Sequence, residues 1–152
     1  MEHLSKHGSG TFRVACLKAR SEDVLHAELH EAGFTCYFLE SHAITDSDSF
    51  LEELCHGCHL SHPPGVKLTS RDAAADLLWQ RIMEQPQSRV AIVWWDAHLL
   101  LDGRLQLLLD CLEFLQGVGE VTEHQAESLD CHPVLLRVVL LGEGPNFHPW
   151  KN

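Results

Sequence analysis

Apolar runs alternate with amphipathic segments along the chain. Four runs rich in Val, Ile, Leu and aromatic residues predict β-strands at 12–19, 34–40, 89–95 and 134–141. Four segments with apolar residues three and four positions apart predict α-helices at 21–32, 45–60, 69–85 and 104–117. This alternation is typical of an α/β fold with a small, mostly parallel sheet packed against helices.

Local signals predict where these helices begin and end. Ser21 can cap the first helix and Gly33 can stop it. Thr69 and Asp72 have the spacing of a capping box at the start of the third helix. The polar residues at 119–133 predict a loop after the fourth helix.

The length of 152 residues predicts one domain, because single domains commonly have about 100–200 residues. We expect this domain at 11–145, between a flexible amino-terminal segment at 1–10 and a carboxy-terminal tail at 146–152. The chain shows no secretory signal pattern and no apolar run long enough to cross a bilayer. These features predict a cytoplasmic location, where cysteine thiols are kept reduced.

The charge balance favours some classes of partner over others. There are 22 acidic residues against 11 Lys and Arg, which gives a formal net charge of −11. This excess argues against direct binding to nucleic acid or to anionic membranes, because both require basic residues. It is compatible with a soluble monomer whose partner is a basic protein.

Motifs of the common enzyme classes are absent from the sequence. The phosphate-binding patterns G-x-x-x-x-G-K-[ST] and G-x-G-x-x-G do not occur, nor does the G-x-S-x-G nucleophile elbow. His98 follows Asp96 after a predicted strand, but no nucleophile, base and orienting group can be identified together. We therefore expect neither an enzyme nor a cofactor.

A cluster of cysteines and histidines at 55–62 offers a different hypothesis. The segment reads CHGCHLSH, and its candidate metal ligands are Cys55, Cys58, His59 and His62. Zinc sites use these residue types, usually as two pairs. The other close pair, Cys131 and His132, lies far away in the sequence. Simple packing of the two cysteines on a helix is the competing interpretation, and metal binding remains an alternative function.

The third predicted helix carries two acidic residues one turn apart. Asp72 and Asp76 are at positions i and i+4, so their carboxylates lie on one helix face. The alanines Ala73, Ala74 and Ala75 between them would keep that surface low enough for another protein to approach closely. From the pattern alone, an acid pair of this kind is more often a solvated helix face than a binding site.

The sequence around this helix resembles the barstar family, the intracellular inhibitors of barnase-type ribonucleases. The family has a proline, a loop and then a helix of the form D-A-L-x-D-x-L; here Pro64 precedes 72-DAAADLL-78. Flanking segments follow the order of family strands and helices, so that the resemblance covers about 12–145, including 34–54, 90–101, 107–116 and 136–144. The resemblance implies a barstar-like fold in two or three layers.

The resemblance also implies a function and a site. Family members block the ribonuclease active site with the acidic helix and the loop before it. Carried over to this chain, the partner-binding residues would be Val66, Lys67, Ser70, Asp72, Ala73, Asp76 and Glu113. The family's loop aromatics are replaced here by Val66 and Lys67, so the loop would form a variable rim. The implied partner is a basic ribonuclease or another nuclease toxin; the alternative is a basic protein that is not a ribonuclease.

Overall fold

The computed structural model describes most of the chain and all four predicted strands. The described residues are 12–18, 22–60, 70–85, 88–128, 134–144 and 147, with 122–128 described by their backbone alone. No helix within these ranges combines the length and the apolar character needed to cross a membrane.

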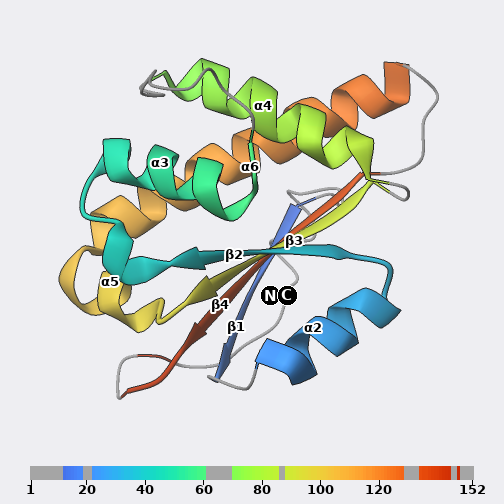
Figure 1. The fold of residues 1–152 in the computed structure, drawn as a ribbon. Coiled ribbons are helices and arrows are strands. Elements are labelled where there is room, and N and C mark those ends of the chain that lie inside the picture. The colour runs from blue at the N-terminus through green and yellow to red at the C-terminus, as the bar shows by residue number, and fades with distance from the viewer. Residues whose placement is uncertain are drawn as a thin grey trace.

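A four-stranded parallel sheet forms the centre of the molecule (Figure 1). Its strand order is β1-β4-β3-β2, with bounds β1 Phe12–Lys18, β2 Thr35–Glu40, β3 Arg89–Trp95 and β4 Leu135–Gly142. The register pairs Ile92 of β3 with Val138 of β4 and with Tyr37 of β2. The predicted α/β fold with a parallel sheet is thus confirmed, and the two most apolar strands, β3 and β4, occupy its centre.

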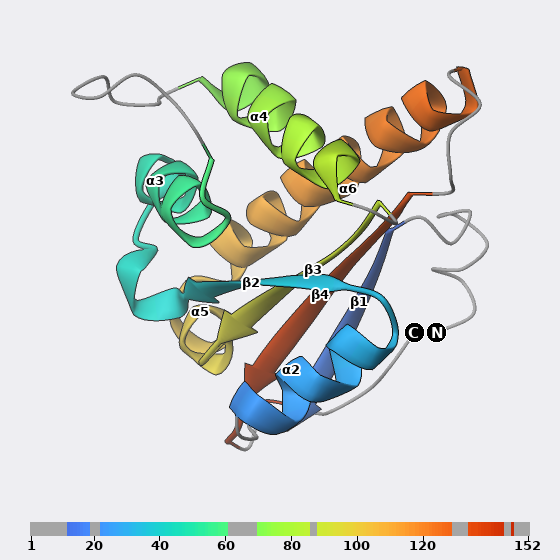
Figure 2. The ribbon, with the colours of Figure 1, turned by 45° about the vertical axis from the view of Figure 1, so that its right-hand side comes forward.

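Helices cover both faces of the sheet unequally. The elements are α2 Glu22–Glu31, η1 Ser41–Ala43, α3 Ser47–Gly57, α4 Arg71–Glu84, α5 His98–Gly103 and α6 Leu105–Ser128. Figures 1 and 2 show α3, α4 and α6 together on one face and α2 on the other. The arrangement has three layers, and the layer with three helices is the thicker one.

The main core lies between the sheet and the layer of α3, α4 and α6. Trp94 of β3 is fully buried and stacks on Phe50 of α3, with ring centroids 5.9 Å apart. Leu78 and Ile82 of α4 and Leu115 of α6 are also fully buried there. Burial of each such side chain contributes about 1.5–3 kcal/mol. This burial fixes which faces of α4 and α6 remain available to a partner.

The last helix is longer than the sequence predicts. The helix expected at 104–117 begins at Leu105 and continues to Ser128, so the loop predicted at 119–133 is wrong over most of its length. Gly117 and Gly119 suggest an end, but α6 passes through both. At Gly119 a Cβ would lie 3.1 Å from Cβ of Phe12, so the glycine allows α6 to pack closely on β1.

Helix starts and stops agree with the sequence in part. Gly33 ends α2 with a left-handed φ of 86°, as predicted. Thr69 of the expected capping box lies outside the described residues, and the residue that caps α4 is Ser70. Backbone N–H of Ala73 donates to Ser70 Oγ at 3.2 Å. The short helix α5 was not predicted.

Candidate functional site

A groove of about 730 Å³ runs between α4 and α6. Its walls bring together residues from the first three turns of α4 and the middle of α6. The lining residues are Arg71, Asp72, Ala75, Asp76, Trp79, Glu113, Phe114, Gly117, Val118 and Val121. Three of the residues predicted to bind a partner, Asp72, Asp76 and Glu113, are among them. The groove is therefore the place where the sequence prediction and the geometry coincide.

The α4 wall carries the two aspartates one turn apart. Asp72 and Asp76 are both exposed, because the opposite face of α4 packs Ala74, Leu78 and Ile82 into the core. Asp72 lies in the first turn of the helix, where a negative charge interacts favourably with the helix dipole. It therefore has a structural role that is independent of any partner.

The α6 wall supplies a third carboxylate and an aromatic ring. Glu113 is exposed, and the adjacent Phe114 is almost fully buried. The guanidinium carbon of Arg71, on α4, lies 5.4 Å from the centroid of the Phe114 ring, in cation–π geometry. Three carboxylates and one guanidinium line the groove, so its charge is negative on balance.

Small residues keep the groove open. Ala75 lines it from α4 and Gly117 lines it from α6. A Cβ added at Gly117 would meet no atom within 4 Å among the neighbours that the structure describes. The expectation that the whole alanine run forms a low outer surface is wrong for Ala74, which is fully buried in the core. Ala73 is half-buried and does not line the groove.

The remaining predicted partner-binding residues have different placements. Val66 and Lys67 lie outside the described residues. Ser70 is exposed and does not line the groove, and its hydroxyl accepts the capping hydrogen bond of α4. The geometry thus groups three of the seven residues around the groove and gives Ser70 a structural function.

Seven of the ten lining residues were missed by the sequence prediction of the site, and Trp79, Gly117 and Val121 are three of them. Trp79 lies three positions after Asp76, so the helical period alone places it on the same side of α4. Its indole Nε1 is buried and makes no hydrogen bond within the described part of the chain. Val118 and Val121 were missed because the fourth helix was expected to end at 117. Val121 is 54% exposed, which makes it an accessible apolar residue of the groove.

The cysteines at 55–62 are arranged for packing. Cys58 is fully buried at the end of α3, and Cys55 is almost so. Burial raises the pKa of both thiols, which disfavours the thiolate that binds metal. His59 is exposed, and His62 lies outside the described residues. In the ranges that the structure describes, no three His, Cys, Asp or Glu side chains could hold a metal ion.

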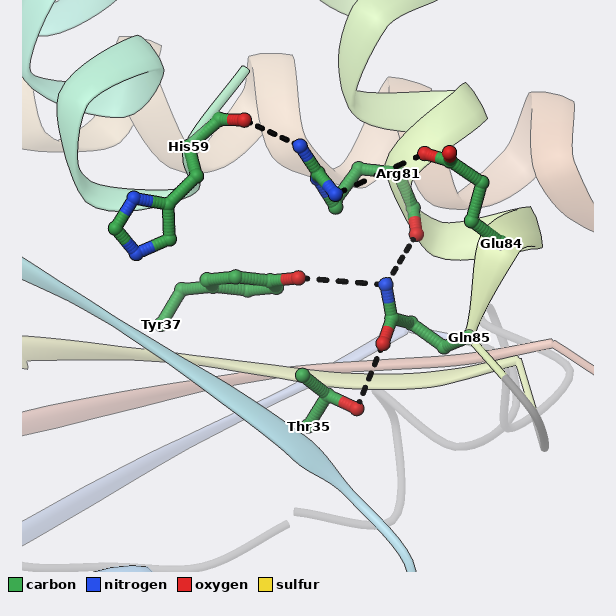
Figure 3. A network of polar contacts seen from close by, with 6 residues as sticks. All are labelled: Thr35, Tyr37, His59, Arg81, Glu84 and Gln85. Atoms are coloured by element: carbon green, nitrogen blue, oxygen red, sulfur yellow. Dashed lines mark hydrogen bonds and ion pairs between the residues drawn. The ribbon is translucent and has the colours of Figure 1, made fainter. Parts of the chain in front are cut away.

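A polar network holds the carboxy-terminal end of α4 on the sheet (Figure 3). Thr35 Oγ1 of β2 donates to Gln85 Oε1 at 3.0 Å, and Gln85 Nε2 donates to Tyr37 Oη at 3.3 Å. Arg81 donates through Nη2 to the backbone carbonyl oxygen of His59, after α3. These contacts join α4 to β2 and to the end of α3, so they fix the helix that carries Asp72 and Asp76.

The groove combines acceptors with an apolar floor. Its carboxylates can accept charge-assisted hydrogen bonds from Arg or Lys, while Phe114, Val118 and Val121 offer apolar contact. This combination suits a cationic protein surface better than a small anionic substrate. Comparison of the chain with models of protein families and with curated proteins found no match.

Proposed function

We propose that this chain is a barstar-like inhibitor, which binds a basic ribonuclease or another nuclease toxin and covers its active site with the acidic side of α4. The observation that carries the proposal is the meeting of Asp72, Asp76 and Glu113 at one groove, although they come from two separate helices. An acid pair on one helix is common on solvated surfaces. A third carboxylate placed beside it by a different helix is a more specific arrangement.

The chemistry of a nuclease active site explains why carboxylates would bind there. Such sites hold RNA phosphates with Arg, Lys and His side chains. The carboxylates of Asp72 and Asp76 can accept hydrogen bonds from those same donors, and charge assistance makes these bonds about twice as strong as neutral ones. The net charge of −11 would also speed the encounter with a basic protein, in a way that salt suppresses.

The apolar part of the groove would contribute affinity and selectivity. Interfaces commonly have an apolar, aromatic-rich centre inside a polar rim. Here Trp79 and Phe114 line the same groove as the three carboxylates, and Val121 is exposed within it. An apolar or aromatic side chain of the nuclease would enter the groove, while its cations pair with the acids.

An RNA-cleavage assay tests the proposed function. Basic barnase-type ribonucleases are mixed with increasing amounts of the chain at low and high salt. Inhibition at stoichiometric concentration by a complex that weakens as salt rises is the expected result. Binding of a basic protein to the groove without inhibition of any nuclease would indicate the alternative, a partner that is not a ribonuclease. Failure of the chain to inhibit any basic nuclease would contradict the proposal.

A further inference from the structure

Three arginines lie on the face of the sheet opposite to the groove. Arg13 of β1 pairs directly with Arg137 of β4, and Arg137 also pairs with Ala91 of β3, two residues after Arg89. Val14, Val138 and Ile92 point into the core under α3, α4 and α6. Because side chains alternate along a strand, Arg13, Arg89 and Arg137 project from the other face, on the side of α2.

The surroundings of the arginines restrain their side chains. Arg89 Nη1 donates to the backbone carbonyl oxygen of Ala32, after the end of α2, at 2.8 Å. The guanidinium carbon of Arg137 lies 5.8 Å from the centroid of the Phe34 ring. Arg13 Nε is buried and makes no hydrogen bond within the described residues. A buried donor without a partner is uncommon in folded proteins.

The three positive charges act on one another. Burial, together with the neighbouring charges of Arg13 and Arg89, lowers the pKa of Arg137 to about 10. Arg137 nevertheless stays protonated at neutral pH. Like charges directly opposite on adjacent strands destabilise a sheet. Within the described part of the chain, Arg13 and Arg89 form no ion pair, although the chain as a whole is strongly acidic.

We propose that Arg13, Arg89 and Arg137 form a binding site for a phosphate-type oxyanion, either inorganic phosphate or the phosphate group of a small molecule. An anion there would offset the repulsion between the two paired arginines and could accept hydrogen bonds from the terminal guanidinium nitrogens of Arg13. In general, a single guanidinium can satisfy both oxygens of a carboxylate through a bidentate contact. Phosphate carries more charge and more acceptor oxygens, so it can bridge guanidinium groups on neighbouring strands.

Thermal unfolding in the presence of different anions tests this site. Sodium phosphate is compared with sodium acetate and sodium chloride at matched ionic strength and pH. Binding with a dissociation constant of about 1 mM would raise Tm by about 3 °C or more at 10 mM phosphate. Arg13→Gln should lose most of that shift. The matched control Arg104→Gln removes an exposed arginine that follows α5, and it should keep the shift.

Amide NMR spectra of the unchanged protein give a second readout that does not depend on the folding of a variant. Phosphate should move the resonances of residues around Arg13, Arg89 and Arg137 in a saturable way, while residues of the groove between α4 and α6 should not move. A glycerol phosphate titration shows whether the site accepts a phosphate monoester as well as the free ion. Equal Tm values in phosphate and chloride, or phosphate-induced shifts at other residues only, would overturn the proposal.

Discussion

Gly117 on α6 and Asp76 on α4 line the same groove, and a side chain at position 117 would project into open space. The closest heavy atoms that the structure describes, apart from its own helix, are more than 4 Å from such a Cβ. A partner that binds Asp76 would therefore approach across position 117, where no side chain fills the groove.

Gly117→Leu should separate partner binding from folding. Replacing glycine inside a helix stabilises it by up to about 1 kcal/mol, so Tm should stay constant or rise. The leucine would occupy the groove and weaken binding of the proposed nuclease partner by about 30-fold, for a steric cost of about 2 kcal/mol. Calorimetric titration measures the affinity. The control Gly103→Leu also adds a side chain in open space, at the end of α5; affinity losses of the same size in both variants would contradict the assignment of the groove.

The role of Ser70 can be tested at the start of α4. Ser70→Ala removes the acceptor for the backbone N–H of Ala73, and loss of such a cap costs about 1 kcal/mol. Urea unfolding should show this loss, while nuclease affinity changes by less than about threefold. Ser47→Ala is the control, because Ser47 begins α3 but Asp46 provides its cap. A large affinity loss with unchanged stability would restore Ser70 to the interface.

The network in Figure 3 should contribute measurably to stability. Gln85→Ala leaves Thr35 Oγ1 without its acceptor and Tyr37 Oη without its donor, in a half-buried place. The free energy of unfolding should fall by about 1–2 kcal/mol. Gln80→Ala, at an exposed position on α4, should change it by less than about 0.5 kcal/mol. Equal effects of the two variants would show that the network does not support α4.

Stability should decrease at alkaline pH because of the cysteines. Burial raises the pKa of Cys16 and Cys36 from 9.0 to about 11, and that of Cys111 to about 12. Between pH 9 and 11 the unfolded chain releases thiol protons that the folded chain retains, so the folded state loses stability as pH rises. Their contribution is complete below pH 9. Urea unfolding under reducing conditions from pH 7.5 to 10.5 should show this decline.

A variant without two of these thiols is the control for the pH dependence. Cys16→Ala combined with Cys36→Ala should give a shallower decline than the unchanged protein, because two of the groups with raised pKa are absent. The comparison uses the slope of stability against pH, so a constant loss of packing energy in the variant does not affect it. Identical slopes would show that these thiols do not cause the decline.

The sequence predicted the strands well because their signal is local. Continuous apolar runs such as 89–95 are recognisable without knowledge of their neighbours, and all four strands lie within one or two residues of the expected bounds. The helix end at 117 was wrong because Gly119 serves packing against Phe12, which is distant in the sequence. A local pattern cannot distinguish that use of glycine from a stop signal.

The candidate site was predicted in part for a similar reason. Asp72 and Asp76 share a helix face by spacing alone, so their proximity could be foreseen. The approach of Glu113 to them depends on how α4 and α6 cross, which no spacing within one segment contains. The buried position of Ala74 follows from the packing of α4 against α3 and α6. The run of alanines does not indicate which side of the helix those neighbours cover.

The affinity of the proposed nuclease partner for an acid-pair variant tests the central claim most directly. Asp72→Asn with Asp76→Asn is compared with Asp23→Asn plus Glu31→Gln, two exposed acids on α2 across the sheet. Both variants remove the same charge, and Asp23, like Asp72, lies in the first turn of its helix. Charge-assisted hydrogen bonds contribute about 1.5–3 kcal/mol each, so the first variant should bind about 100-fold or more weakly and the second within about threefold. Equal affinity of the first variant and the unchanged protein would contradict the account.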